Sequence, residues 1–230
     1  MSMQVIRSHT PSEQAGKALE ALLQKNVSRP IALFLSGGSA FSLLEYISLD
    51  GIGSQVTVSL IDERCSTDPQ VNNYAQLLRT TFMQNAIARG AQVMVPEIID
   101  EDSCRETSMR FELALYEWKT KYPNGVVIAT LGVGSDGHTA GIMPGEHGVD
   151  FSGDDLVVSY TVPRAVNQYT KRITTTYTFL TTYVDHAVVF AVGEEKRRIL
   201  AALEAGECDI QSTPACIFTK MSDTTLYTDI

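Results

Sequence analysis

Runs of consecutive apolar residues recur along the chain and predict strands that are buried on both faces of a parallel sheet. Pro96 interrupts one of these runs, which places that strand near an edge of the sheet, because proline cannot donate to the hydrogen-bond ladder. Stretches with alternating or β-branched residues predict further strands in the second half of the chain. The expected strands are Ile31–Leu35, Val56–Ile61, Gln92–Ile98, Val126–Thr130, Leu156–Val162, Lys171–Thr176, Ala187–Val192 and Pro214–Phe218.

Between these runs, apolar residues return every three or four positions, which predicts amphipathic helices. In the longest of them we expect a buried face that carries Met109, Leu113, Tyr116 and Trp118. Strands that alternate with helices predict an α/β fold, here a Rossmann-like open sheet, mostly parallel, with helices on both faces. The expected helices are Pro11–Asn26, Ala40–Ile47, Tyr74–Ala88, a stretch from Asp102 or Ser103 to Tyr122, and Glu194–Ala205.

Composition narrows the class of protein. With 230 residues, 44% of them hydrophobic, the chain can bury one sizeable core, so we expect a single domain over residues 1–230. The formal net charge of -9 argues against a surface that binds nucleic acid or membranes. No apolar run approaches the length of a membrane-spanning helix, and residues 1–7 lack the apolar core of a signal peptide, so we expect a cytoplasmic protein. The four cysteines are scattered without a Cys-x-x-Cys pair, which predicts reduced thiols.

The segment after the Val126–Thr130 strand holds three glycines, an aspartate and a histidine within seven residues. Ligands of open α/β sheets bind beyond the carboxyl ends of the strands. A histidine held there by a tight turn suits proton transfer near neutral pH, so His138 is a candidate general base and Asp136 its candidate partner. The plainer alternative is a structural histidine that caps its own turn.

The glycines of this segment, Gly132, Gly134 and Gly137, also match the spacing of the dinucleotide-binding fingerprint. We reject that interpretation because the turn lies in mid-chain and because Pro144 limits any helix that starts at Gly137. In addition, a carboxylate and an imidazole stand where that fingerprint needs only close approach of the backbone.

Metal ions have little support in the sequence. The spacing of Asp136, His138 and His147 matches no familiar ligand pattern. His9 and His186 have no clustered partners, so we expect them to be structural or exposed. We therefore expect neither a metal nor another cofactor.

A loop of glycine and serine, Ser36-Gly37-Gly38-Ser39, follows the Ile31–Leu35 strand. A strand, a Gly/Ser loop and a helix together present backbone N–H groups and a helix N-terminus to a phosphate. An ordinary tight turn between strand and helix explains the same residues. No Gly-Lys-Ser/Thr follows, so the loop is not a P-loop, and Ser39 lacks the flanking glycines of a nucleophile elbow.

Charged residues follow other expected strands. Asp62-Glu63-Arg64 comes directly after one strand and forms either a solvated loop or part of the crevice. Arg172 belongs to a basic pair that leads a later strand. Lys196 falls in the first turn of a helix, where anions are preferred, so it is either solvated or shares a bound anion with the helix dipole.

Five motifs, which together span about residues 31–218, occur along the chain in an order that resembles 6-phosphogluconolactonase. That family belongs with the glucosamine-6-phosphate isomerases in one α/β superfamily. Arg64 and Thr139 favour the lactonase branch, because the isomerase branch typically has tyrosine and isoleucine at these two places. The five motifs are Leu35–Ser39, Asp62–Arg64 with Asn73, Leu131–Ala140, Arg172–Thr174 and Gly193–Lys196.

The resemblance implies hydrolysis of 6-phospho-D-glucono-1,5-lactone to 6-phospho-D-gluconate, in the oxidative branch of the pentose phosphate pathway, without a metal. His138 would activate the water, Asp136 would orient the loop or the imidazole, and Arg64 or backbone N–H groups would stabilise the oxyanion. The residues implied in catalysis are His138, Asp136, Arg64 and Asp62, and those implied in binding the substrate and its phosphate are Ser36, Gly37, Gly38, Ser39, Gly134, Arg164, Arg172 and Lys196.

The chain departs from the family around the rim of the expected pocket. Cys65-Ser66-Thr67 stands where the family usually has Val-Pro, and Arg164 stands where it usually has lysine. One rival is an isomerase or deaminase of amino-sugar phosphates, in which Asp62 would abstract a proton. A second rival is a non-catalytic sugar-phosphate sensor. In each case the expected partner is a small molecule, and the expected state is a monomer or a small homo-oligomer.

Overall fold

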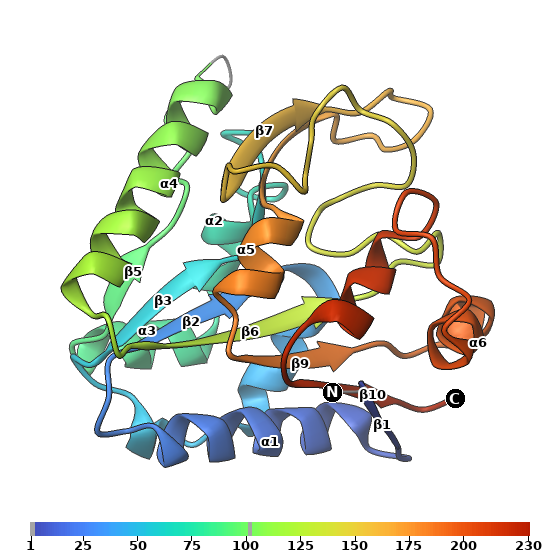
Figure 1. Ribbon diagram of the computed structural model, residues 1–230. Helices are drawn as coiled ribbons and strands as arrows, with labels where there is room; N and C mark the ends of the chain where they lie inside the picture. Colours follow the sequence, from blue (N-terminus) through green and yellow to red (C-terminus); the bar gives the residue numbers. More distant parts are fainter. Residues whose placement is uncertain (1–2, 101–102) are drawn as a thin grey trace.

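The computed structural model describes residues 3–100 and 103–230. Within these residues, seven strands form one sheet in which every neighbouring pair is parallel, which confirms the predicted α/β class (Figure 1). The strands lie in the order β1 (Gln4–Arg7), β10 (Thr224–Thr228), β9 (His186–Phe190), β6 (Val126–Gly132), β2 (Ile31–Leu35), β3 (Val56–Leu60) and β5 (Gln92–Met94), with β5 at an edge as predicted.

The direction of chain progress through this sheet reverses between β2 and β6. From β2 the chain adds β3 and β5 on one side, and from β6 it adds β9 and β10 on the other. A sheet that reverses its strand order opens a crevice at the carboxyl ends of the two central strands. The glycine-rich segments that follow β2 and β6 therefore meet at this crevice.

Helices cover both faces of the sheet (Figure 1). Strand β2 shows the division: Ile31, Leu33 and Leu35 belong to one hydrophobic cluster, whereas Ala32 and Phe34 belong to the other. The first cluster is completed by α1 (Pro11–Lys25), α2 (Asn73–Leu78), α3 (Thr81–Ala88) and the 3-10 helix η1 (Gly38–Tyr46), and the second by α4 (Cys104–Lys121), α5 (Tyr177–Thr182) and α6 (Arg197–Ala205).

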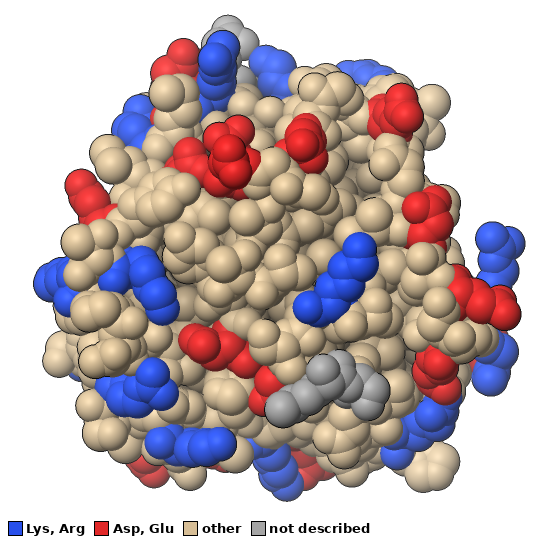
Figure 2. Space-filling view, in the orientation of Figure 1, with Lys and Arg blue, Asp and Glu red and all other residues tan. Residues whose placement is uncertain are grey.

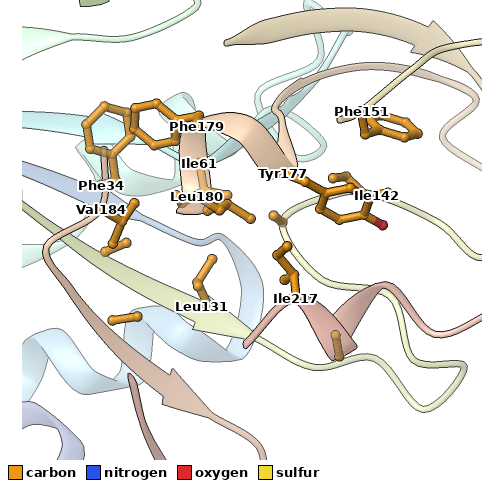
Figure 3. Packing of buried hydrophobic residues seen from close by; sticks show 14 of the residues in the cluster. Phe34, Ile61, Leu131, Ile142, Phe151, Tyr177, Phe179, Leu180, Val184 and Ile217 are labelled. Carbon is orange, nitrogen blue, oxygen red and sulfur yellow. The ribbon is translucent and has the colours of Figure 1, made fainter. Parts of the chain in front are cut away.

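Aromatic rings fill the second cluster at two points (Figure 3). The rings of Phe34 and Phe179 lie 4.8 Å apart between the sheet and α5. Phe151 lies farther along, with its ring 5.8 Å from that of Tyr177 and 5.2 Å from that of Tyr160. This packing joins α5 to the long loop after β6, so the core extends to the segment that follows the glycine-rich turn.

A second sheet of three antiparallel strands was not expected from the sequence. It consists of β4 (Asp62–Arg64), β8 (Lys171–Thr175) and β7 (Val157–Thr161). Asp62 is paired with Thr174 and Arg64 with Arg172. The charged triplet after β3 is therefore an ordered strand and not a solvated loop.

Several predicted elements differ in the structure. A 3-10 helix replaces the helix expected at Ala40–Ile47, and the stretch Tyr74–Ala88 breaks in two because the Thr80 hydroxyl accepts the N–H of Met83 and begins a new helix. Pro214–Phe218 is not a strand, because it belongs to the 3-10 helix η4 (Pro214–Lys220). Strand β1 was missed and β10 supplies the last strand. The remaining 3-10 helices are η2 (Leu49–Gly51) and η3 (Glu194–Lys196).

The buried face predicted for α4 was wrong at three of its four residues, and only Trp118 is buried as expected. Met109, Leu113 and Tyr116 are 60%, 58% and 42% exposed. The helix carries a second apolar stripe, Phe111, Leu115 and Trp118, and this stripe faces the core. The bulkier aromatic side chains lie inside, where the Trp118 indole N–H donates to the Thr57 hydroxyl at 3.0 Å.

The prediction of reduced thiols was also wrong, because all four cysteines are paired in the structure. One disulfide joins Cys65, directly after Arg64, to Cys104 at the start of α4. The other joins Cys208 to Cys216 across the segment that precedes and enters η4. Scattered cysteines gave no spacing signal for either bridge, since the fold alone brings them together.

We expect protein purified without reductant to show no titratable thiol in denaturant and four thiols after reduction. The Cys65→Ser/Cys104→Ser variant should lose about 2–4 kcal/mol of unfolding free energy, because this bridge closes a long loop of the unfolded chain. The difference from the wild type should vanish when both proteins are measured in excess dithiothreitol. Four free thiols in the untreated protein would contradict the pairing.

Candidate active site

A cavity of about 240 Å³ lies at the carboxyl ends of β2 and β6, the two neighbouring strands between which the strand order reverses. Larger hollows occur elsewhere, including one of about 550 Å³ beside Phe41, but this smaller one gathers the predicted charges. Its lining includes Ser36, Gly37, Gly38, Ser39, Asp62, Arg64, Gly134, His138, Arg172 and Lys196. The structure thus brings together ten of the twelve residues that the sequence nominated.

The other two nominated residues lie elsewhere. Asp136 is behind His138 and reaches the cavity only through that ring. Arg164 is an exposed residue of the loop between β7 and β8 and does not line the cavity. Its role in binding the substrate therefore stays a prediction.

His138 and Asp136 form a hydrogen-bonded pair at the tight turn after β6. The Nδ1 atom of His138 lies 2.6 Å from Oδ1 of Asp136, and the same oxygen accepts the backbone N–H of His138 at 3.1 Å. Gly134 is required here, because a Cβ atom on it would lie 2.1 Å from Nδ1. Since Asp136 occupies Nδ1, the second ring nitrogen is left for a ligand.

The electrostatics of this pair favour an ionised Asp136. Burial raises the pKa of Asp136, but hydrogen bonds from His138 and its charge outweigh burial and lower the pKa below its usual value. A carboxylate that stays ionised holds the imidazole in one orientation and favours a proton on Nδ1. The histidine therefore does more than cap its own turn, since its ring borders the cavity.

A buried ion pair lies next to this turn. Nη1 of Arg172 lies 3.1 Å from Oδ2 of Asp62, and both side chains are less than 10% exposed. Gly141 packs directly against this carboxylate: its φ is +69°, and a Cβ atom would lie 2.5 Å from Oδ2. The ion pair thus fixes the relative position of β8, β4 and the loop that carries His138.

Arg64 supplies a second guanidinium group to the cavity. Its Nη1 donates to the carbonyl oxygen of Val71 at 3.0 Å, and its guanidinium lies 5.6 Å from the centre of the Tyr169 ring. Among the described residues, the Nε–H groups of Arg64 and Arg172 have no acceptor. Two guanidinium groups that line one cavity are suited to an anionic or carbonyl ligand.

The Ser36–Ser39 loop and Lys196 face the same cavity from β2 and from the start of α6. The Ser36 N–H donates to the Thr130 hydroxyl of β6 at 3.1 Å, which ties the loop to the neighbouring strand. Gly38 has a φ of +67°, a conformation that favours glycine. A positively charged side chain beside a glycine-rich loop is a suitable anion site.

Three hydroxyl groups hold the carbonyl groups around His138, and the sequence predicted this role for none of them. Thr139 donates to the Gly132 carbonyl at 2.7 Å, Thr174 donates to Ala140, and Tyr160 donates to Gly141. Burial raises the pKa of Tyr160 to about 12, so it remains a phenol donor. Thr174 ends the Arg172–Thr174 motif, but its hydroxyl was given no role there, and the sequence held no signal for Tyr160, because the second sheet was not expected.

The alternative metal site is not assembled. His147 lies in a different hollow, where its Nε2 is 3.0 Å from the Met143 carbonyl oxygen and its ring lies 5.4 Å from that of Tyr160. Within the described residues, no three histidine, cysteine, aspartate or glutamate side chains are grouped to hold a metal ion. In the same residues, no helix is long and apolar enough to cross a membrane.

Glu63 is fully buried behind the cavity and accepts three backbone N–H groups. Its Oε1 atom accepts from Arg64 and Asn73 at 2.7 and 2.6 Å, and Oε2 accepts from Tyr74 at 2.8 Å. Burial raises the pKa of Glu63 to about 7, although the three N–H groups act in the opposite direction. This carboxyl group thus joins β4 to the start of α2.

Glu63 should make stability depend on pH. Between pH 4.5 and about 7 the folded protein retains a proton that the unfolded chain has released, so the contribution of this group to stability falls as pH rises through that range. The shift corresponds to at most about 3 kcal/mol. In urea unfolding, the unfolding free energy of wild type relative to Glu63→Gln should therefore be lower at pH 8 than at pH 5, because glutamine does not titrate.

Asn72→Ala provides the control for this experiment. Asn72 also caps α2, since its side chain accepts the N–H of Ala75 at 2.8 Å, but it carries no titratable group. The difference between wild type and Asn72→Ala should be constant with pH. An equally constant difference for Glu63→Gln would show that Glu63 does not titrate in this range.

Comparison of the sequence with known proteins identifies one family. The family of glucosamine-6-phosphate isomerases/6-phosphogluconolactonase matches residues 8–227. A 6-phosphogluconolactonase of Pseudomonas aeruginosa is 29% identical over 145 residues, covering 62% of this chain and 57% of the relative. Another from Helicobacter pylori strain J99 is 31% identical over 134 residues, covering 57% and 55%. The matched region thus spans a little over half the length of these curated relatives.

Solved structures share the fold over almost the whole chain. The 6-phosphogluconolactonase from Plasmodium vivax superposes with a TM-score of 0.76 at 18% identity, over 97% of this chain and 89% of that one. A monomeric glucosamine-6-phosphate deaminase gives 0.74 at 20% identity, over 98% and 97%. Both branches of the superfamily therefore share this architecture, and the match over residues 8–227 shows that the chain belongs to the glucosamine-6-phosphate isomerase/6-phosphogluconolactonase family.

Proposed function

We propose that this protein hydrolyses 6-phospho-D-glucono-1,5-lactone to 6-phospho-D-gluconate, with a water molecule activated by His138 and without a metal. The observation that carries the proposal is the position of the His138–Asp136 pair at one cavity with Arg172, Lys196 and the Ser36–Ser39 loop. A base and an anion site at the same cavity suit a substrate that has a phosphate at one end and a reactive carbonyl at the other.

In this mechanism Nε2 of His138 takes a proton from water as the water oxygen attacks the lactone carbonyl carbon. Negative charge then develops on the carbonyl oxygen, and the Arg64 guanidinium or N–H groups of the turn stabilise it. The tetrahedral intermediate collapses, the bond from the carbonyl carbon to the ring oxygen breaks, and the imidazolium returns its proton to that oxygen. A lactone is an activated ester, so these groups suffice without a covalent nucleophile.

The phosphate would lie against the Ser36–Ser39 loop. Backbone N–H groups of the loop and the charges of Lys196 and Arg172 would supply charge-assisted hydrogen bonds. The surface in Figure 2 shows acidic and basic side chains interspersed, with no continuous basic patch on that face. We therefore propose a small anionic substrate, no nucleic-acid or membrane partner, and a monomer or small homo-oligomer. All four cysteines are paired, which is rare in cytosolic proteins, so the expected cytoplasmic location is not part of the proposal.

The rival reaction, isomerisation or deamination of an amino-sugar phosphate, would use Asp62 as the base. Asp62 lines the cavity, but its carboxylate is buried and paired with Arg172 at 3.1 Å. The same oxygen, Oδ2, lies against Gly141, so it is enclosed by the protein on two sides. The geometry therefore favours His138 as the base and hydrolysis as the reaction.

The test is loss of 6-phosphogluconolactone generated in situ, corrected for spontaneous hydrolysis. His138→Ala should lower kcat by about 10²–10⁴-fold, because that is the usual contribution of a positioned general base. His186→Ala is a matched control. Nδ1 of His186 also lies 2.6 Å from a carboxylate oxygen, of Asp223, but this pair is at the amino end of β9, so the variant should retain wild-type activity.

Each rival predicts a different result in this assay. Wild-type protein that binds 6-phosphogluconate but accelerates no hydrolysis would be a sensor. Release of ammonia from glucosamine 6-phosphate, without lactone hydrolysis, would indicate the deaminase. Equal losses in His138→Ala and His186→Ala would mean that neither histidine acts as the base.

We expect Tyr160→Phe to lower kcat roughly tenfold, because a loosened loop misplaces His138 relative to the substrate. The substitution removes the donor to the Gly141 carbonyl and the acceptor of the Met143 N–H. Tyr177→Phe, which removes another buried phenol hydroxyl, 3.4 Å from the Ile210 carbonyl oxygen, should leave kcat within twofold if Tyr160 acts through this loop. Equal kcat values for wild type and Tyr160→Phe would exclude that role.

A further inference from the structure

Asn73 connects the strand that carries Asp62 and Arg64 to helix α2. It is the first residue of α2 and is fully buried. Its side-chain Nδ2 donates to the backbone carbonyl oxygen of Asp62 at 3.0 Å, and its backbone N–H donates to Oε1 of Glu63 at 2.6 Å. Two hydrogen bonds therefore fix the position of this amide relative to β4.

The other side of the Asn73 amide lies against Gly37. A Cβ atom built on Gly37 would lie 2.2 Å from Oδ1 and 2.6 Å from Cγ of Asn73. Gly37 has φ -76° and ψ -177°, an extended conformation that any residue adopts. The backbone does not require glycine here, so close contact with Asn73 is the reason that a side chain is excluded.

The Oδ1 atom of Asn73 is buried, and among the described residues it has no hydrogen-bond donor. A buried carbonyl oxygen without a donor is costly and is retained only where its surroundings require it. The surroundings here are the Gly37 backbone on one side and β4 on the other. Asn73 thus acts as a spacer between two segments that line the cavity, although it does not line the cavity itself.

We infer that Asn73 is a positioning residue that determines selectivity for a phosphorylated substrate. By holding Gly37, it fixes the Ser36–Ser39 loop relative to β4. Donors that are ordered before the ligand arrives bind it more tightly than donors that must be ordered by it. The inference rests on the proposed function, in which this loop receives the phosphate group.

The first test compares 6-phosphogluconolactone with unphosphorylated glucono-1,5-lactone. Asn73→Ala should lower the ratio of their kcat/KM values roughly tenfold, because loss of preorganisation weakens only the contacts to phosphate. The larger change should appear in KM for the phosphorylated lactone and the smaller one in kcat, because Asn73 lies against Gly37 directly but reaches the His138 turn only through the Asp62 backbone. A merely structural role would reduce kcat/KM for both lactones alike.

Asn72→Ala is the matched control. Asn72 is the preceding residue, also buried, and its side chain donates to the Ser66 carbonyl and caps α2, but it is not among the atoms next to Gly37. It should lower the melting temperature as Asn73→Ala does and leave the selectivity ratio unchanged. An equal loss of selectivity in both variants would overturn the inference.

A second test uses the contact itself. Gly37→Ala alone should weaken binding of 6-phosphogluconate about tenfold, since its Cβ atom would overlap Asn73. In Gly37→Ala/Asn73→Ala the new methyl group occupies the space that the amide has left, so affinity should recover above that of Gly37→Ala. Losses that simply add, measured by titration calorimetry, would exclude a direct contact between these residues.

Binding also separates this inference from the proposed reaction. Wild-type protein that hydrolyses neither lactone but binds 6-phosphogluconate more tightly than gluconate would contradict the proposed reaction. The ratio of these two affinities in wild type, Asn73→Ala and Asn72→Ala would then still test the role of Asn73. If wild-type protein does not distinguish 6-phosphogluconate from gluconate, both the phosphate site and the role of Asn73 are overturned.

Discussion

The buried ion pair between Asp62 and Arg172 is the interaction on which the rest of the site depends. It joins two strands that are 110 residues apart in the chain, and Gly141 packs on its carboxylate. Removing one partner of a buried pair costs about 3–5 kcal/mol, because the remaining charge has no compensation. The loop that carries His138 takes its position from this pair, so a charge within the protein determines where the candidate base lies.

Around this ion pair, close contacts at glycines and hydrogen bonds from hydroxyl groups hold the loops of the candidate site in place. Glycines allow close approach at three points: Gly37 to Asn73, Gly134 to the His138 ring, and Gly141 to Asp62. Hydroxyl groups of the second sheet then hold the carbonyl groups of the turn. The parallel sheet supplies the crevice and the antiparallel sheet supplies most of the groups that hold the His138 turn.

The sequence predicted the parallel sheet well because buried strands are continuous apolar runs, as at Ile31–Leu35. It also located Ser36–Ser39 and His138, because local turn chemistry is visible in adjacent residues. The second sheet was missed because Asp62–Arg64 is short and charged, and its pairing with β8 depends on contacts distant in sequence. The buried face of α4 was predicted wrongly at Met109, Leu113 and Tyr116, because two sets of apolar residues satisfy the same helical period and only packing distinguishes them.

The order of strands at one edge of the parallel sheet also constrains how the molecule is made. Strand β10, formed by residues 224–228, lies between β9 and β1, with Val5 opposite Leu226. During synthesis β1 therefore has no strand to pair with until β10 has been made, although the central strands can already pair. Until β10 is added, one edge of β9 has unpaired backbone groups, and an unpaired edge of this kind can pair with another chain.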